Sequence, residues 1–129
     1  MSANAGVGAY QQVMTVTADP GARLLLLFDG LVRFLRQGVD ALRAGSTGRF
    51  THAVARAQAI VTELAGSLDH AAGGPLAADL SRLYEFLLRH LSAGLMAKDA
   101  RHLDEALRVI EPLREGFARA AEEAPRERR

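Results

Sequence analysis

The stretch from Leu76 to Met96, LAADLSRLYEFLLRHLSAGLM, constrains the fold of this chain more than any other. On a helix of about 100° per residue, its large apolar side chains cover an arc of roughly 200°. In order around the helix, the members of this arc are Phe86, Leu83, Leu76, Leu87, Leu80, Leu91, Tyr84, Leu95 and Leu88. One neighbouring helix cannot cover so wide an arc. The stretch therefore predicts a central helix of a bundle, with part of the arc free as a binding surface.

Two further amphipathic segments precede this helix. The first is expected to begin at Asp19-Pro20, because Asp suits the N-cap and Pro suits the first helical position. It runs to about Ala44, where Gly45-Ser46-Thr47-Gly48 predicts a stop and a new start. The second helix is expected over residues 49–72.

Two breaks delimit the remaining helices. Gly73-Gly74-Pro75 is the clearest interruption in the chain and predicts the boundary before the Leu76 helix. A turn over residues 97–99 leads to a last helix with Asp99 as its N-cap. That helix is expected to bend at Pro112 and to end near residue 124.

Four helices with short connections predict an all-α fold, an antiparallel four-helix bundle over residues 19–124. Residues 1–18 show no helical period and are interpreted as a mobile N-terminal arm, and residues 125–129 as a disordered basic tail. The N-terminus lacks the basic-then-apolar pattern of a secretory signal, and the longest large-apolar run, Leu24 to Phe28, is too short to span a membrane. A soluble, cytoplasmic protein is therefore expected.

The residue types favour a binding module over an enzyme. The chain has no cysteine, which excludes a thiolate metal site, and no phosphate-binding loop or nucleophile elbow. No cofactor and no metal are expected. Lys and Arg number 16 against 15 Asp and Glu, a balance that gives no electrostatic footprint for nucleic acid.

The four histidines leave one alternative function open. His52, His70 and His102 fall on or near polar faces and are expected to be solvated. His90 lies inside the apolar arc and is expected to be partly buried and bonded to a backbone group or a carboxylate. Histidine phosphotransfer domains are four-helix bundles with one exposed histidine, and His52 is the candidate. The residues after it match poorly, because such domains commonly have Lys and Gly there.

Four segments carry a resemblance to a known family. They are AYQQV at 9–13, TADPGARLLLLFDGLVRFL at 17–35, AQAIVTELAGSLD at 57–69 and LSRLYEFLLRHLSAGLMAKDARHLDEALRVIEPL at 80–113. In this succession, over most of the chain, they resemble the flagellin export chaperone family, FliS. Two departures are visible: Phe117 stands where the family often has Trp, and Pro112 interrupts the last helix.

The resemblance implies a small cytoplasmic chaperone that uses no nucleotide or metal. Such proteins bind the C-terminal segment of newly made flagellin, prevent its premature polymerisation and deliver it to the export gate. In the family a tyrosine near the start is linked to docking at the gate, and Tyr10 is the matching residue. With no client bound, the arm is expected to lie over the client groove.

Partner-binding residues are expected in the arm, on the first helix and along the arcs of the second and third helices. The candidates are Tyr10, Val13, Leu26, Ile60, Leu64, Tyr84, Leu88, Leu91 and Leu95. The pattern does not separate core from groove within this set. A homodimer formed through the same apolar patches stays an open alternative.

Overall fold

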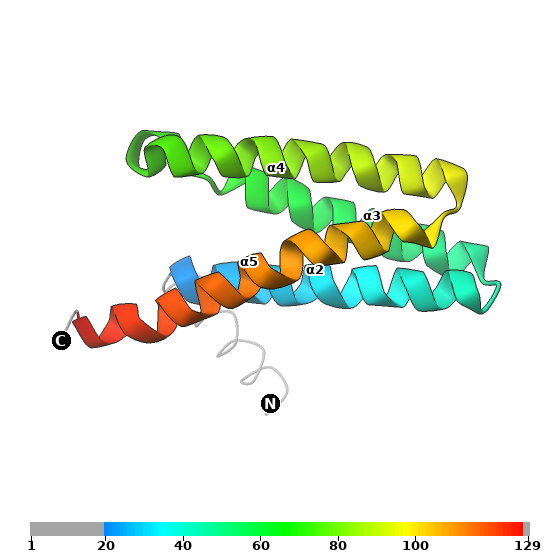
Figure 1. Ribbon diagram of the computed structural model, residues 1–129, viewed down its shortest axis with the longest axis horizontal. Helices are drawn as coiled ribbons and strands as arrows, with labels where there is room; N and C mark the ends of the chain where they lie inside the picture. Colours follow the sequence, from blue (N-terminus) through cyan, green and yellow to red (C-terminus); the bar gives the residue numbers. More distant parts are fainter. Residues whose placement is uncertain (1–19, 128–129) are drawn as a thin grey trace, which may run out of the picture.

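The computed structural model describes residues 20–127, with side chains described for residues 21–123. The chain forms four helices: α2 (Pro20–Arg43), α3 (Thr47–Gly66), α4 (His70–Ala97) and α5 (Ala100–Glu127). Figure 1 shows them running in alternating directions, joined by short turns. The described range contains no strand, so the predicted all-α antiparallel four-helix bundle is confirmed. The predicted N-terminal arm lies outside the described residues.

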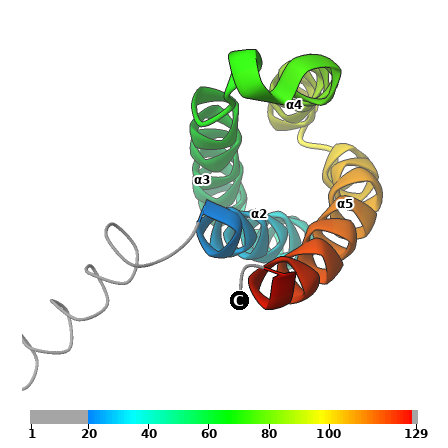
Figure 2. The same cartoon turned by 90° about the vertical axis from the view of Figure 1, so that its left-hand side faces the viewer.

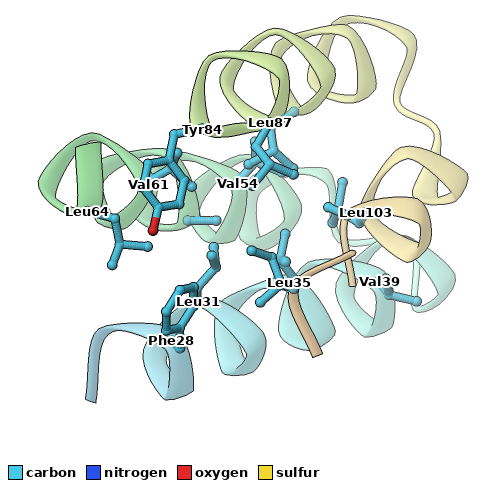
Figure 3. Packing of buried hydrophobic residues seen from close by; sticks show 14 of the residues in the cluster. Phe28, Leu31, Leu35, Val39, Val54, Val61, Leu64, Tyr84, Leu87 and Leu103 are labelled. Carbon is cyan, nitrogen blue, oxygen red and sulfur yellow. The ribbon is translucent and has the colours of Figure 1, made fainter. Parts of the chain in front are cut away.

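The four helices form a closed ring. Each helix packs on its neighbour in the chain, and α5 returns to pack on α2. The end view in Figure 2 shows α2, α3, α4 and α5 in that order around a common axis. The largest fully buried side chains point into this ring. Figure 3 labels ten residues of this core. They are Tyr84, Phe28, Phe50, Leu31, Leu35, Leu64, Leu87, Leu91, Leu103, Ile110, Val54 and Val61.

The turn between α2 and α3 follows the predicted pattern. Gly45 has a φ of 79°, a left-handed conformation that glycine adopts without steric cost. The Gly45 N–H donates to the Leu42 carbonyl at 3.0 Å, and the Ser46 N–H donates to the Ala41 carbonyl at 2.8 Å. These bonds satisfy carbonyls that would otherwise be left open at the end of α2.

The predicted end of the second helix is wrong, whereas the predicted break at Gly73-Gly74-Pro75 is present as a kink inside α4. α3 ends at Gly66, six residues before the expected end at residue 72, and α4 begins at His70. Asp69 caps α4, because its side chain accepts a hydrogen bond from the Ala72 N–H at 3.0 Å. Gly74 and Pro75 lie inside α4 as a kink, where Gly74 takes φ 52° and ψ −130°. Only glycine adopts such a conformation readily, so the helix is interrupted at Gly74 and resumes after the kink.

The turn between α4 and α5 is confirmed at residues 97–99. Lys98 adopts the left-handed conformation, with φ 53°, and its N–H and that of Asp99 reach back to the end of α4. The Asp99 carboxylate accepts from the Arg101 N–H at 2.9 Å and from the Arg101 guanidinium, which lowers the pKa of Asp99. α5 then continues through the exposed Pro112 to Glu127, past the expected end near residue 124.

Candidate apolar binding pocket

An apolar pocket of about 630 Å³ opens at one end of the bundle. It lies where α2 begins, α3 ends, α4 begins and α5 approaches its C-terminus, the end that faces the viewer in Figure 2. Its lining residues come from all four helices: Arg23, Leu24, Leu27, Leu64, Ser67, Leu68, Asp69, Ala72, Gly73, Leu76, Ala77, Leu80, Tyr84 and Phe117. We call this site the apolar pocket.

The pocket exists because α4 and α5 diverge. The two helices are close at their shared turn and separate toward the opposite end, as both Figure 1 and Figure 2 show. Phe117 of α5 therefore packs on α2, where its ring stacks on Phe28 with 5.5 Å between centroids. Leu76 also lines the pocket, just after the Gly74 kink, with 60% of its surface exposed. Apolar surface of this kind is typical of a site for another apolar segment.

The polar groups at the rim of the pocket are already bonded. Arg23 forms an ion pair with Glu63 of α3, and the Ser67 hydroxyl donates to the Leu64 carbonyl at 2.9 Å. Asp69 is engaged as the cap of α4. A ligand would therefore meet a mostly apolar interior, with orientation set by shape and by a few rim charges.

Tyr84 is the most buried of the polar residues that line the pocket. Figure 3 shows its ring extending from α4 toward α2, beside Val61 and Leu64. The residue is 1% exposed. Burial raises the pKa of Tyr84 to about 12, because the phenolate is poorly solvated there. The side chain is therefore a neutral phenol at any physiological pH.

Tyr84 should make the bundle sensitive to alkali. An unfolded tyrosine ionises near pH 10, whereas folded Tyr84 keeps its proton to about pH 12. The contribution of the protonated phenol to the free energy of unfolding is fully present below pH 10 and is lost as the pH rises through 12. At pH 11 the loss is about 1 kcal/mol. Urea unfolding at pH 9 and pH 11 should show this loss in the wild type and not in Tyr84→Phe. An equal loss in both proteins would place the cause elsewhere.

The structure distributes the nine predicted partner-binding residues over several environments. Tyr10 and Val13 lie outside the described residues. Leu64 and Tyr84 line the apolar pocket. Leu91 is fully buried in the core, so no partner contacts it while the bundle is closed. The side chains that are half-buried and packed on the core, away from this pocket, are Ile60, Leu88 and Leu95.

Leu26 lies on an outer face of α2, with 43% of its surface exposed. It does not line the apolar pocket, and neither does Ile60.

The sequence interpretation missed most of the pocket. Its unanticipated apolar members are Leu24, Leu27, Leu68, Leu76, Leu80 and Phe117. One signal was available: Leu76 lies near the middle of the apolar arc, directly after Gly73-Gly74-Pro75. An apolar residue at the end of a helix, next to a chain break, has fewer neighbouring residues to cover it. Such a residue can remain exposed even when it lies on the face that the helix buries. The divergence of α5 carries no such local signal.

The histidines show one confirmation and one correction. His90 is half-buried, and its Nε2 lies 2.7 Å from Glu105 Oε1, as expected for a partly buried histidine bonded to a carboxylate. His102 was expected to be solvated, but it is half-buried against His90, with 4.7 Å between the ring centroids. The close crossing of α4 and α5 encloses it, and its Nδ1 is buried without a hydrogen-bond partner in the described residues. His52 and His70 are exposed.

Two other kinds of site are absent from the described residues. Within residues 20–127, no three His, Asp or Glu side chains are grouped so that they could hold a metal ion. Over the same range, no helix is both long and apolar enough to cross a membrane.

The fold and the pocket define a class: a small helical bundle with an open apolar pocket at one end. The family model for "Flagellar protein FliS" matches residues 2–124. The chain therefore belongs to the FliS family, whose curated members are flagellar secretion chaperones, and the resemblance seen in the sequence is confirmed.

Relatives from three bacteria show how far the similarity extends. The flagellar secretion chaperone FliS of Salmonella typhimurium is 30% identical over 131 residues, covering 92% of each chain. That of Campylobacter jejuni is 28% identical over 117 residues, covering 91% of each chain. That of Bacillus subtilis is 27% identical over 120 residues, covering 93% of this chain and 89% of its own. The similarity thus spans the whole bundle.

Proposed function

We propose that this protein is a cytoplasmic export chaperone that binds the C-terminal segment of flagellin through the apolar pocket. In this role it prevents premature polymerisation of the subunit and delivers it to the flagellar export gate. The observation that carries the proposal is an uncovered apolar pocket in a member of a family of flagellar secretion chaperones. The family match favours this role over phosphotransfer from His52.

The physical chemistry of the pocket suits an amphipathic segment. A client that is unordered before binding loses conformational entropy when it docks, so it must bury a large apolar area to bind usefully. The leucines of α2 and α4 and the Phe117 ring offer such an area at the mouth of the pocket. The neutral hydroxyl of Tyr84 adds one group that can donate a hydrogen bond without the cost of a buried charge.

A calorimetric titration tests the site. A peptide spanning the last helices of flagellin should bind with a negative heat-capacity change, the marker of apolar burial. Leu76→Asp should weaken this binding about tenfold, or about 1.4 kcal/mol, because it places a charge on the pocket wall. The fold should persist, because Leu76 is already largely in water.

Met96→Asp is the matched control, on the same helix but outside the pocket, with 87% of its surface exposed. It should leave peptide binding unchanged. If the two substitutions weakened peptide binding equally, the peptide would not bind in the apolar pocket. If no C-terminal flagellin peptide binds at all, the chaperone proposal fails.

The N-terminal arm joins the bundle beside the apolar pocket. α2 begins at Pro20, and Leu24 and Leu27 on the pocket wall follow within two turns, so the chain enters α2 beside the pocket. An arm that covers the empty pocket and leaves when the client binds would make Tyr10 available to the gate only in the loaded chaperone. Such cover would also protect the apolar surface from aggregation.

Deleting residues 1–16 should then tighten binding of the flagellin peptide modestly, by about 1 kcal/mol, the free energy of arm docking after its ordering cost. Amide exchange should show the arm more protected in the free chaperone than in the complex. Tyr10→Ala should spare peptide binding and reduce the amount of flagellin exported. Equal or greater protection of the arm in the complex would contradict the competition between arm and client.

A further inference from the structure

The outer seam between α2 and α3 lies on the side of the ring away from α4 and α5, as the end view shows (Figure 2). Leu26 and Ile60, two of the predicted partner-binding residues, belong to this face rather than to the apolar pocket. We define the outer α2–α3 seam by six residues: Leu26, Gly30, Arg33, Phe34, Arg56 and Ile60. The residues on the α2 side recur every three to four positions, so they form one continuous ridge.

The floor of the seam is apolar and close to the backbone. Leu26 is the one exposed large apolar residue among the described residues of α2, and Phe34 and Ile60 are half-buried. Gly30 lies between them, and a Cβ at that position would be 3.1 Å from Ile60 Cδ1. Because glycine has no side chain, Ile60 packs directly against the backbone of α2 at the buried Gly30.

Two arginines give the seam its charge. The guanidinium of Arg33 lies 5.2 Å from the centre of the Phe34 ring, and that of Arg56 lies 5.5 Å from it. In the described part of the chain neither arginine forms an ion pair, whereas Arg23, Arg36 and Arg114 do. Contact with the ring holds the two charges at the surface without neutralising them.

The same face continues into a hollow. A depression of about 400 Å³ lies between the end of α2 and the start of α3, and it includes Gln37, His52 and the single carboxylate of Asp40. From Leu26 to Ala41 the groove is about 22 Å long, enough for about four turns of a docked helix. A groove between two packed helices is the shape into which a third helix fits.

We propose that the outer α2–α3 seam is a second interaction surface, and that it binds an amphipathic helix carrying acidic residues beside an apolar stripe. The apolar stripe covers Leu26, Phe34 and Ile60, and the carboxylates pair with Arg33 and Arg56. Charge complementarity selects the acidic helix, because the arginines present unpaired positive charge on both sides of an apolar floor. This surface is distinct from the apolar pocket, so the chaperone can hold both ligands at once.

A pair of synthetic peptides tests the proposal. Both are amphipathic helices of about four turns with leucines at helical spacing. One carries glutamates on either side of the leucines, and the other carries lysines at the same positions. The full-length chain should bind the glutamate peptide at least tenfold more tightly than the lysine peptide at low salt, and added salt should reduce the difference. The amide signal of Gly30 should shift in the nuclear magnetic resonance spectrum as the glutamate peptide is added.

Charge reversal supplies the matched variants. Arg33→Glu combined with Arg56→Glu should invert the preference between the two peptides. Arg82→Glu combined with Arg89→Glu makes the same change in charge on exposed residues of α4 and should leave the preference intact. Both variants should bind the flagellin peptide as the wild type does, which separates this test from that of the apolar pocket.

Four results would overturn the proposal. They are equal affinity for the two peptides, shifts confined to the apolar pocket, loss of flagellin binding in the Arg33 and Arg56 variant, and a homodimer that Leu26→Asp dissociates without altering peptide binding. The third would make the seam part of the client path, and the fourth would assign it to a second copy of the chain.

Discussion

Replacing Leu87 with aspartate should unfold the bundle. Leu87 is fully buried, at the middle of the apolar arc of α4, where it faces α2, α3 and α5 across the core (Figure 3). The substitution removes a core side chain, a loss of about 2–5 kcal/mol, and leaves a carboxylate among apolar groups with no partner. The sum is comparable to the whole stability of a domain of this size, about 5–15 kcal/mol.

The same substitution at two other positions of α4 provides a comparison for the loss of stability at Leu87. Leu88→Asp should cost less, because Leu88 is only half-buried at the edge of the arc. Met96→Asp should leave stability nearly unchanged, because its side chain is almost entirely in water. Circular dichroism at 25 °C should show helix in the second and third variants and little in the first. Similar losses at Leu87 and Leu88 would mean that the whole arc is core.

The helical pattern predicted most of the fold because each helix has one apolar face. Leu31 and Leu35 in α2, and Leu103 and Ile110 in α5, recur at helical spacing and are all buried. Apolar residues recur at this spacing because one face of each helix is buried against its neighbours. The sequence pattern therefore identifies the residues that form the core. The pattern does not record how far apart two helices lie. That distance decides whether an apolar side chain becomes core or pocket.

Leu76 and Leu91 illustrate this limit. Both lie in the apolar arc of α4, yet Leu91 is completely buried and Leu76 is mostly exposed. The difference comes from the divergence of α4 and α5, which leaves the start of α4 packed on α3 but without α5 beside it. That divergence is a tertiary property, and no residue within the arc encodes it alone. The partner-binding residues predicted from this arc therefore mixed the core residue Leu91 with Tyr84, which lines the pocket.

The misplaced boundary between α3 and α4 has a different origin. Gly73-Gly74-Pro75 looked like a break between helices, because both residue types interrupt helices. In the fold, Asp69 begins the helix earlier, and Gly74 absorbs the change in direction that Pro75 requires. The capping side chain of Asp69 starts α4 one helical turn upstream, so the break at Gly74 is a kink within α4 and not its beginning. The resulting kink sets the first turn of α4 at the rim of the pocket.

Replacing Gly94 with alanine should destabilise the bundle by about 1–3 kcal/mol, the usual cost of overpacking. Gly94 lies where α4 and α5 cross, and a Cβ there would be 2.6 Å from the Cβ of His102 and 3.1 Å from its Cγ. These atoms lie close to the α5 backbone, so relief requires the two helices to separate. The intrinsic preference of a helix for alanine over glycine, up to about 1 kcal/mol, is too small to offset that strain.

Gly116→Ala is the matched control, because the same substitution is made in α5 at an exposed position with nothing within 4 Å of the added Cβ. There the helix preference acts alone and should raise the free energy of unfolding by about 0.5–1 kcal/mol. The two variants should therefore move the urea midpoint in opposite directions. A stabilising Gly94→Ala would show that α4 and α5 do not approach so closely. In that case the half-buried setting of His102, and the divergence that opens the pocket at the far end, would both have to be revised.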